Sequence, residues 1–156
     1  MLRPRLLVVM GLVGLGLGLL GAAVAETAPK PATKEEVTVY KSSTCECCKK
    51  WVEHLQAAGF TVNVHDEANM AQIKDDAGVP EAARSCHTAK VGKYLVEGHV
   101  PADLIVKMLT ERPNIAGIAA PGMPVGSPGM ERGDAKPPYD IVSFTKDGKT
   151  EVYAKR

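Results

Sequence analysis

Aromatic residues make up only 4% of this chain of 156 residues, so aliphatic side chains have to build most of any hydrophobic core. An excess of charge is also missing, because the formal net charge is +1. Without a large basic field, the sequence gives no sign of a nucleic-acid partner. The length is nevertheless enough for one domain with a core of its own.

The first 25 residues do not fit such a domain. Arg3 and Arg5 form a basic head, residues 6–22 are an unbroken run of apolar residues and glycine, and Ala23-Val24-Ala25 is a small-x-small cleavage site. This pattern predicts a secretory signal peptide over residues 1–25. The alternative is an uncleaved membrane anchor, since the run is nearly long enough to span a bilayer. The glycines and the Ala-x-Ala end favour cleavage.

Cleavage after Ala25 removes two arginines and no acidic residue, so the mature net charge becomes about +1 − 2 = −1. No cysteine follows the apolar run, so nothing suggests a lipoprotein. We therefore expect an exported protein that is not attached to the membrane. Prolines and alanines predict a short linker over residues 26–35, and residues 36–156 form the predicted domain.

Apolar periodicity and turn residues predict a regular order of elements in this domain. They are a strand at 37–40, a helix at 49–58 capped by Ser43 or Thr44, a strand at 60–65, a helix at 70–77, a hairpin of 89–91 and 94–96, a helix that Pro101 opens and Pro113 closes, and a hairpin of 141–145 and 151–153. The order βαβ-α-ββα is that of a thioredoxin-like α/β domain whose first two strands are parallel. This analogy concerns the fold and fixes no function.

Three of the four cysteines fall within four residues, Cys45-Glu46-Cys47-Cys48, at the predicted turn from strand to helix. Free amide hydrogens and the helix dipole favour thiolates there, which predicts thiol pKa values below the usual value of about 8.5. The fourth, Cys86, precedes the third strand, and the predicted fold makes it face the other three. Purely structural disulfides are disfavoured, because the adjacent Cys47 and Cys48 can hardly bond to each other without strain.

Residues 113–138 differ from the rest of the domain, because they hold six prolines and five glycines without any periodicity. A loop of this length in a compact domain is usually functional or disordered. Two Pro-Gly-Met units within it place the thioethers of Met123 and Met130 seven residues apart. The predicted fold is therefore a thioredoxin-like domain with a Pro/Gly/Met-rich loop and a C-terminal β-hairpin.

Two kinds of chemistry suit these sulfur atoms. Cys45 and Cys48 form a C-x-x-C pair, which is typical of thiol–disulfide exchange. The additional Cys47 would disturb a simple dithiol cycle, whereas four convergent thiols suit a soft metal. Adjacent cysteines fit a zinc site badly, while Cu(I) forms thiolate-bridged clusters and also accepts thioether sulfur. The residues thus favour copper, with Met123 and Met130 as further ligands or as part of a loop that closes over the site.

The histidines and large apolar residues have less specific roles. His87 adjoins Cys86 and is a candidate accessory ligand that could hold Cu(II). His99 is expected to cap the third helix, with ligation as the alternative, and His54 and His65 are expected to be ordinary exposed residues. Trp51 and Met70 are expected in the core.

Taken together, these motifs resemble a bacterial family long described as a domain of unknown function, which includes the CopG copper-resistance proteins. The resemblance covers about residues 37–153 and rests on Cys-x-Cys-Cys after a strand, then Ser-Cys-His-Thr-Ala, Gly-His-Val-Pro and Pro-Gly-Met-Pro-x-Gly-Ser-Pro-Gly-Met-Glu. It implies a periplasmic, thioredoxin-like protein with a cysteine-bridged multi-copper cluster. The family's cysteines match Cys45, Cys47, Cys48 and Cys86, and its methionine loop matches Met123 and Met130.

We therefore expect a periplasmic protein that binds several Cu(I) ions for copper resistance. Whether it is also an enzyme, a copper oxidoreductase that interconverts Cu(I) and Cu(II), is left open by the sequence. The alternative is a periplasmic thiol–disulfide oxidoreductase that uses Cys45 and Cys48. The expected partners are copper ions and other periplasmic copper-handling proteins.

Overall fold

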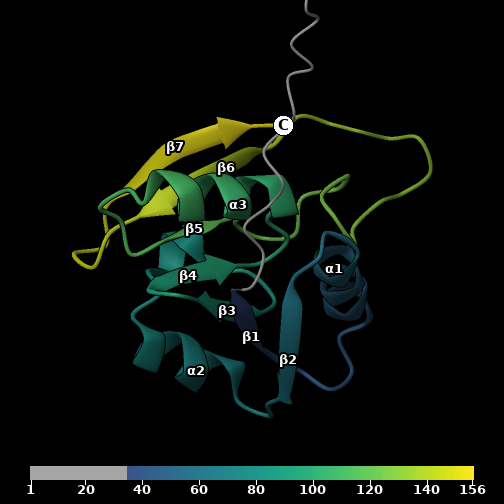
Figure 1. Ribbon diagram of the computed structural model, residues 1–156. Helices are drawn as coiled ribbons and strands as arrows, with labels where there is room; N and C mark the ends of the chain where they lie inside the picture. The colour runs from purple at the N-terminus through teal and green to yellow at the C-terminus, as the bar shows by residue number, and fades with distance from the viewer. Residues whose placement is uncertain (1–34) are drawn as a thin grey trace, which may run out of the picture. The chain divides into compact units, whose positions relative to one another are not determined.

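The computed structural model describes residues 35–156 (Figure 1). The predicted signal peptide, residues 1–25, and all but the last residue of the predicted linker, residues 26–35, lie outside the described residues. None of the helices in the described part has the length and apolar character that a membrane crossing requires.

Residues 35–156 form a mixed α/β fold with seven strands and three α-helices. The first part of the chain follows the predicted order: β1 (Glu36–Lys41), α1 (Glu46–Ala57), β2 (Thr61–Asp66), α2 (Met70–Ala77), a short 3-10 helix η1 (Glu81–Ala83), β3 (Thr88–Val91), β4 (Tyr94–Glu97) and α3 (Ala102–Glu111). The remaining strands are β5 (Gly117–Ala119), β6 (Asp140–Phe144) and β7 (Thr150–Lys155).

All strands belong to one sheet in the order β2-β1-β3-β4-β5-β6-β7 (Figure 1). β1 and β2 are parallel and connected through α1, as predicted, and Val39 lies opposite Val64. β3 is antiparallel to β1 and forms the predicted hairpin with β4. This topology brings the C-terminal end of β1 next to the start of β3, where the cysteine turn and Cys86 are found.

One strand was not predicted. β5 lies inside the segment 113–138 that we expected to be a loop, and it pairs in parallel with β4 and antiparallel with β6. A Cβ atom on Gly117 would lie 2.2 Å from the carbonyl oxygen of Leu95, so only glycine allows this close pairing. β5 connects the terminal hairpin of β6 and β7 to the rest of the sheet.

Two helix boundaries differ from the prediction. α1 begins at Glu46, and its N-cap is Cys45 rather than Ser43 or Thr44, because the Cys45 Sγ accepts the backbone N–H of Cys48. Pro101 is the N-cap of α3 and not its first helical residue.

The core lies on both faces of the sheet. Ile118 packs in one cluster and Ala119 in the other, and neighbouring residues of a strand point to opposite faces. The larger cluster joins α1 and α3 to the sheet, and its fully buried side chains include Val37, Val39, Trp51, Leu55, Ile105 and Met108. Trp51 is a core residue as expected, whereas Met70 is only half-buried.

Candidate metal centre

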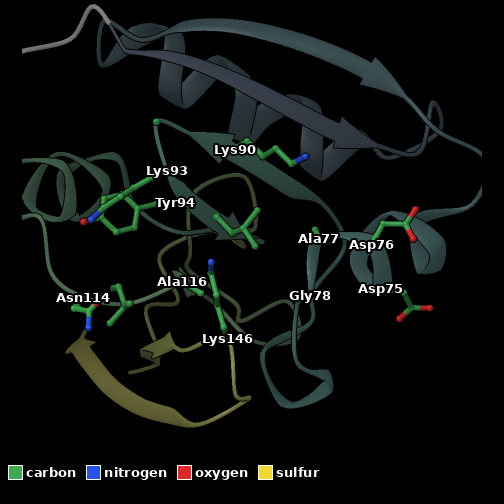
Figure 2. Close-up of a pocket in the computed structure, with 13 residues that line it drawn as sticks. Asp75, Asp76, Ala77, Gly78, Lys90, Lys93, Tyr94, Asn114, Ala116 and Lys146 are labelled. Carbon is green, nitrogen blue, oxygen red and sulfur yellow. The ribbon is translucent and has the colours of Figure 1, made fainter.

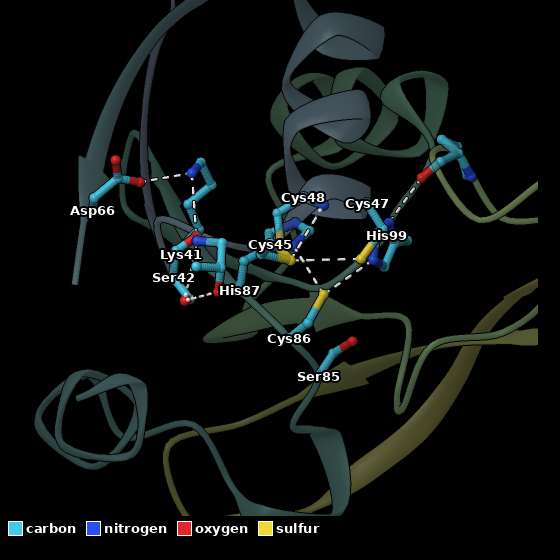
Figure 3. Close-up of a disulfide and its surroundings, with 12 residues drawn as sticks. Lys41, Ser42, Cys45, Cys47, Cys48, Asp66, Ser85, Cys86, His87 and His99 are labelled. Carbon is cyan, nitrogen blue, oxygen red and sulfur yellow. Dashed lines mark hydrogen bonds and ion pairs between the residues drawn. A yellow bond between two sulfur atoms is a disulfide. The ribbon is translucent and has the colours of Figure 1, made fainter. Parts of the chain in front are cut away.

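Four sulfur atoms meet at the N-terminal end of α1. The Sγ atoms of Cys45, Cys47, Cys48 and Cys86 all lie within 4.8 Å of one another (Figure 3). The first three come from the turn between β1 and α1, and Cys86 comes from the segment that enters β3. The prediction that Cys86 faces the other three is therefore confirmed.

The four cysteines are present in two oxidation states. Cys45 and Cys48 form a disulfide with 5.3 Å between their Cα atoms, whereas Cys47 and Cys86 are free thiols. The Cys45 and Cys47 Sγ atoms are 3.5 Å apart. The bonded pair is thus the C-x-x-C pair, while the adjacent Cys47 and Cys48 are not bonded to each other, as expected.

Two buried histidines approach the Cys86 sulfur. The Cys86 Sγ lies 3.0 Å from His99 Nε2 and 3.2 Å from His87 Nδ1, and both imidazoles are 0% exposed. The Nδ1 atom of His99 is 2.8 Å from the carbonyl oxygen of Pro128, which can only accept a hydrogen bond. His99 therefore carries its proton on Nδ1, and its Nε2 lone pair points at the sulfur.

His99 corrects the sequence prediction. It does not cap α3, because its ring contacts Cys86 and Pro128; instead, His54 Nε2 accepts the backbone N–H of Ala102 at 3.1 Å. His54 is accordingly half-buried rather than exposed, while His65 is exposed as expected. The only sequence signal for His99 was its position two residues before Pro101, where a helix was expected to begin.

The His87 ring is enclosed between two other rings. It lies 4.3 Å from the Trp51 ring and 5.0 Å from the His99 ring, measured between centroids. Its Nε2 atom is buried and has no hydrogen-bond partner among residues 35–156. Burial and the nearby His99 and Lys74 lower the pKa of His87 well below its usual value, so the ring is neutral and has a lone pair to offer.

Burial also determines the protonation of the fourth cysteine. Desolvation, together with the negative charge of the neighbouring Cys47, raises the pKa of Cys86 to about 12. Without a cation the Cys86 sulfur therefore keeps its proton, and a soft cation would have to displace it. Cys45 and Cys48 do not titrate as a disulfide, so the predicted lowering of the thiol pKa values in the cysteine turn stays a prediction.

The Pro/Gly/Met segment closes against the same place. The Gly122 N–H donates to the Arg84 carbonyl oxygen, and the Ser85 hydroxyl donates to the Gly122 carbonyl oxygen, next to Cys86. Further along, a Cβ atom on Gly129 would lie 2.7 Å from the Cys47 carbonyl oxygen, so the loop backbone touches the first turn of α1. Met123 is 53% exposed and Met130 is half-buried.

A hollow lies at the other end of β3 (Figure 2). It has a volume of about 660 Å³, and its lining includes Lys90, Lys93 and Lys146 together with Asp75 and Asp76. It contains no cysteine or histidine among its lining residues. This hollow therefore offers charged groups but no soft ligand for copper.

Comparisons with known proteins agree with this geometry. The family model described as "Protein of unknown function, DUF411" matches residues 83–130, which include Cys86, His87, His99 and the part of the Pro/Gly/Met segment that carries Met123 and Met130. A search of curated proteins found no match to this chain.

Two solved structures are similar over almost their whole length. "Copper resistance protein copG- Form 2" is 47% identical, with a TM-score of 0.74, and the match covers 78% of this chain and 98% of that one. "Copper resistance protein copG- Form 1" is also 47% identical, with a TM-score of 0.73, covering 78% and 96%.

Proposed function

This chain belongs to the family of CopG-like copper-resistance proteins, and from that premise we propose that it binds several Cu(I) ions for copper resistance. The observation that carries the proposal is the convergence of four Sγ atoms within 4.8 Å of one another. Thiolate sulfur is the soft ligand that selects Cu(I). The adjacent Cys47 and Cys48 fit a cluster with bridging sulfur atoms better than a zinc site.

The two buried imidazoles extend this donor set. His87 was a candidate from its sequence position, and His99 joins it because its Nε2 lies 3.0 Å from the Cys86 Sγ. The Pro128 carbonyl oxygen accepts the Nδ1 proton of His99, which is the usual way to orient a metal-binding imidazole. Nitrogen ligands also suit Cu(II), so they support the proposal that the protein interconverts Cu(I) and Cu(II).

Met123 and Met130 stay proposed ligands of a weaker kind. The turn that carries Met130 is held by its own hydrogen bonds, from the Gly126 N–H to the Met130 carbonyl oxygen and from the Met130 N–H to the Ser127 carbonyl oxygen. Met123 is 53% exposed, so its side chain has little packing to lose and can turn toward an arriving ion. Thioether sulfur is a good ligand for Cu(I) and a poor one for zinc.

The disulfide adds a redox condition to this function. With Cys45 and Cys48 joined, only two of the four sulfur atoms are free, so a four-thiolate cluster forms after two electrons have reduced the bond. The same disulfide favours the alternative function, a thiol–disulfide oxidoreductase that uses this pair. The order β1-α1-β2-α2-β3-β4-α3 supports a thioredoxin-like domain. Such a fold is compatible with both copper binding and thiol–disulfide exchange.

The location follows from the N-terminal residues. We propose that residues 1–25 are a signal peptide, that residues 26–35 are a linker and that residues 36–156 are the periplasmic copper-binding domain, which can meet other copper-handling proteins there. The mass of the protein isolated from the periplasm tests this, because it should begin at Glu26. Full-length protein in the membrane fraction would contradict cleavage.

The substitution Cys47→Ser separates the two functions. It leaves the C-x-x-C pair intact and removes one sulfur atom that only a metal cluster needs. After reduction and anaerobic loading, we expect the variant to hold fewer Cu(I) ions per protein than the native chain and to protect cells less against copper. Insulin reduction on the same preparations measures the exchange activity.

The control is Cys48→Ser, which breaks both the pair and the cluster. Copper loading should fall in both variants, whereas exchange activity, if present, should be lost only in Cys48→Ser. Full copper loading in Cys47→Ser together with strong insulin reduction would reject the copper-cluster function and favour the oxidoreductase.

A further inference from the structure

A buried carboxylate lies directly behind the Cys86 segment. Glu97, the last residue of β4, is 0% exposed. Its Oε1 accepts the backbone N–H of Ser85 at 2.7 Å, and its Oε2 accepts the hydroxyl of Thr88 at 2.7 Å. Ser85 and Thr88 are the residues on either side of Cys86-His87, so one side chain holds both ends of the segment that carries the fourth cysteine.

Lys74 of α2 completes this arrangement from the other side. Its Nζ is 2.5 Å from Glu97 Oε1 and 3.0 Å from Thr88 Oγ1, and the residue is only 6% exposed. Ala89 and Val91 pack in the core under α1 and α3, so the alternate residue Thr88 faces α2. The ion pair thus lies on the face of the sheet opposite α1. It holds the two residues that flank Cys86-His87 from the α2 side of the sheet.

Backbone contacts of β4 tighten the same segment. The Gly98 N–H donates to the His87 carbonyl oxygen at 2.9 Å, and a Cβ atom on Gly98 would lie 2.3 Å from the Ser85 Oγ. Gly98 has φ +68, a conformation that favours glycine. The Cys86 segment is therefore packed so closely against the residue after β4 that it cannot shift toward this strand.

A buried ion pair is expensive to desolvate and is weak evidence for stability. Here the ion pair has a positional role, because the hydrogen bonds of the Glu97 carboxylate go to Ser85 and Thr88, the residues that flank Cys86-His87, and to Lys74. We propose that Glu97 is a positioning residue that fixes the Cys86 sulfur against the other three cysteines, with Lys74 as its counter-ion. This inference rests on the proposed copper function.

The first test needs no copper. In protein that keeps the Cys45–Cys48 disulfide, Cys47 and Cys86 are the free thiols that iodoacetamide labels, and the ratio of their labelling rates measures how firmly Cys86 is held. We expect Glu97→Ala to raise the Cys86/Cys47 ratio several-fold, since the Ser85 N–H and the Thr88 hydroxyl lose their shared acceptor. The matched control is Phe144→Leu, which loosens the core on the same face as Lys74 but removes none of the Glu97 hydrogen bonds, so it should leave the ratio unchanged.

The second test uses Cu(I) in an anaerobic competition assay, at a temperature at which all variants are folded. We expect Glu97→Ala to weaken Cu(I) binding roughly 10- to 100-fold, the usual effect of removing a group that orients a ligand. The double variant Lys74→Met with Glu97→Gln keeps an acceptor for the Ser85 N–H without a buried charge and should recover most of the affinity. Should Glu97→Ala not fold, Thr88→Val removes one of the two anchors and must raise the labelling ratio.

The outcomes separate the two claims. An unchanged labelling ratio in folded Glu97→Ala, or an equal rise in Phe144→Leu, would overturn the positioning role even if the native protein binds copper. A raised ratio in a protein that binds no Cu(I) would support the positioning role and reject the proposed copper function.

Discussion

Gly129 offers a quantitative test of how the Pro/Gly/Met segment closes over the cysteines. Its backbone has φ +85, and an added Cβ would lie 2.7 Å from the Cys47 carbonyl oxygen and 3.0 Å from the Trp51 nitrogen. These two atoms are four residues apart on α1, where they form a hydrogen bond of the helix. Neither can move without disturbing the first turn, which carries the cysteines.

The cost of Gly129→Ala has two parts. A left-handed conformation costs a residue with a side chain about 1–2 kcal/mol. Overpacking against atoms that cannot yield adds about 1–3 kcal/mol. The variant should therefore lose about 2–5 kcal/mol of unfolding free energy. For a domain of this size each kcal/mol lowers Tm by about 4 °C.

Gly133→Ala is the matched control, because Gly133 lies in the same segment with φ +55 but nothing within 4 Å of its added Cβ. It carries only the conformational strain of about 1–2 kcal/mol. Thermal unfolding of both copper-free variants measures the difference. If the segment lifts away from α1 instead, the contact between His99 and Pro128 is lost, and Cu(I) affinity should fall in Gly129→Ala but not in Gly133→Ala. Equal Tm and equal Cu(I) affinity in the two variants would refute the close approach of the loop.

Two further predictions concern the loop methionines and the pH dependence of stability. Replacing Met123 and Met130 with Leu keeps their volume, so Cu(I) affinity should fall while the Tm of the copper-free protein barely changes; an equal loss of both would mean that they only pack. Burial lowers the pKa of His54, and the nearby Glu131 and Asp103 oppose this shift only in part. The contribution of His54 to the free energy of unfolding is therefore present above its pKa in the unfolded chain, about 6.5, and is lost as the pH falls toward its pKa in the folded protein. Urea unfolding between about pH 7.5 and pH 5 should show a shallower pH dependence in His54→Gln, and an unchanged slope would exclude the role of His54.

The elements that sequence reasoning predicted well are those with local signals. β1, α1 and β2 combine alternating or helical apolar patterns with Gly59 as a stop, and both hairpins have turn residues between β-branched runs. β5 had no such signal, because Gly117-Ile118-Ala119 is too short to show a period. Its pairing depends on the neighbours β4 and β6, which lie far away along the chain.

At the site, too, the residues with local signals were predicted, and those whose role depends on side-chain contacts distant along the chain were not. The position of the three clustered cysteines follows from a local strand-to-helix turn, and Cys86 could be placed through the order of the strands. The role of His99 could not, because its two ring nitrogens contact Cys86, 13 residues away, and Pro128, 29 residues away. A histidine directly before Val-Pro at a helix start looked like a cap, and the cap contact turned out to come from His54, which lies 48 residues before the Ala102 whose N–H it accepts.

The missed strand also changes how the Pro/Gly/Met segment should be understood. A segment of six prolines without periodicity suggested a functional or disordered loop, but β5 fixes its beginning and β6 fixes its end within one sheet. Between these strands, Gly122 bonds to Arg84 and Ser85, and Pro128 bonds to His99. Each contact uses backbone atoms of the segment: Gly122 offers both its N–H and its carbonyl oxygen, while Pro128, which has no N–H, offers its carbonyl oxygen. These backbone contacts hold the loop without the methionine side chains, which is why replacing Met123 and Met130 tests their proposed role as ligands separately from packing.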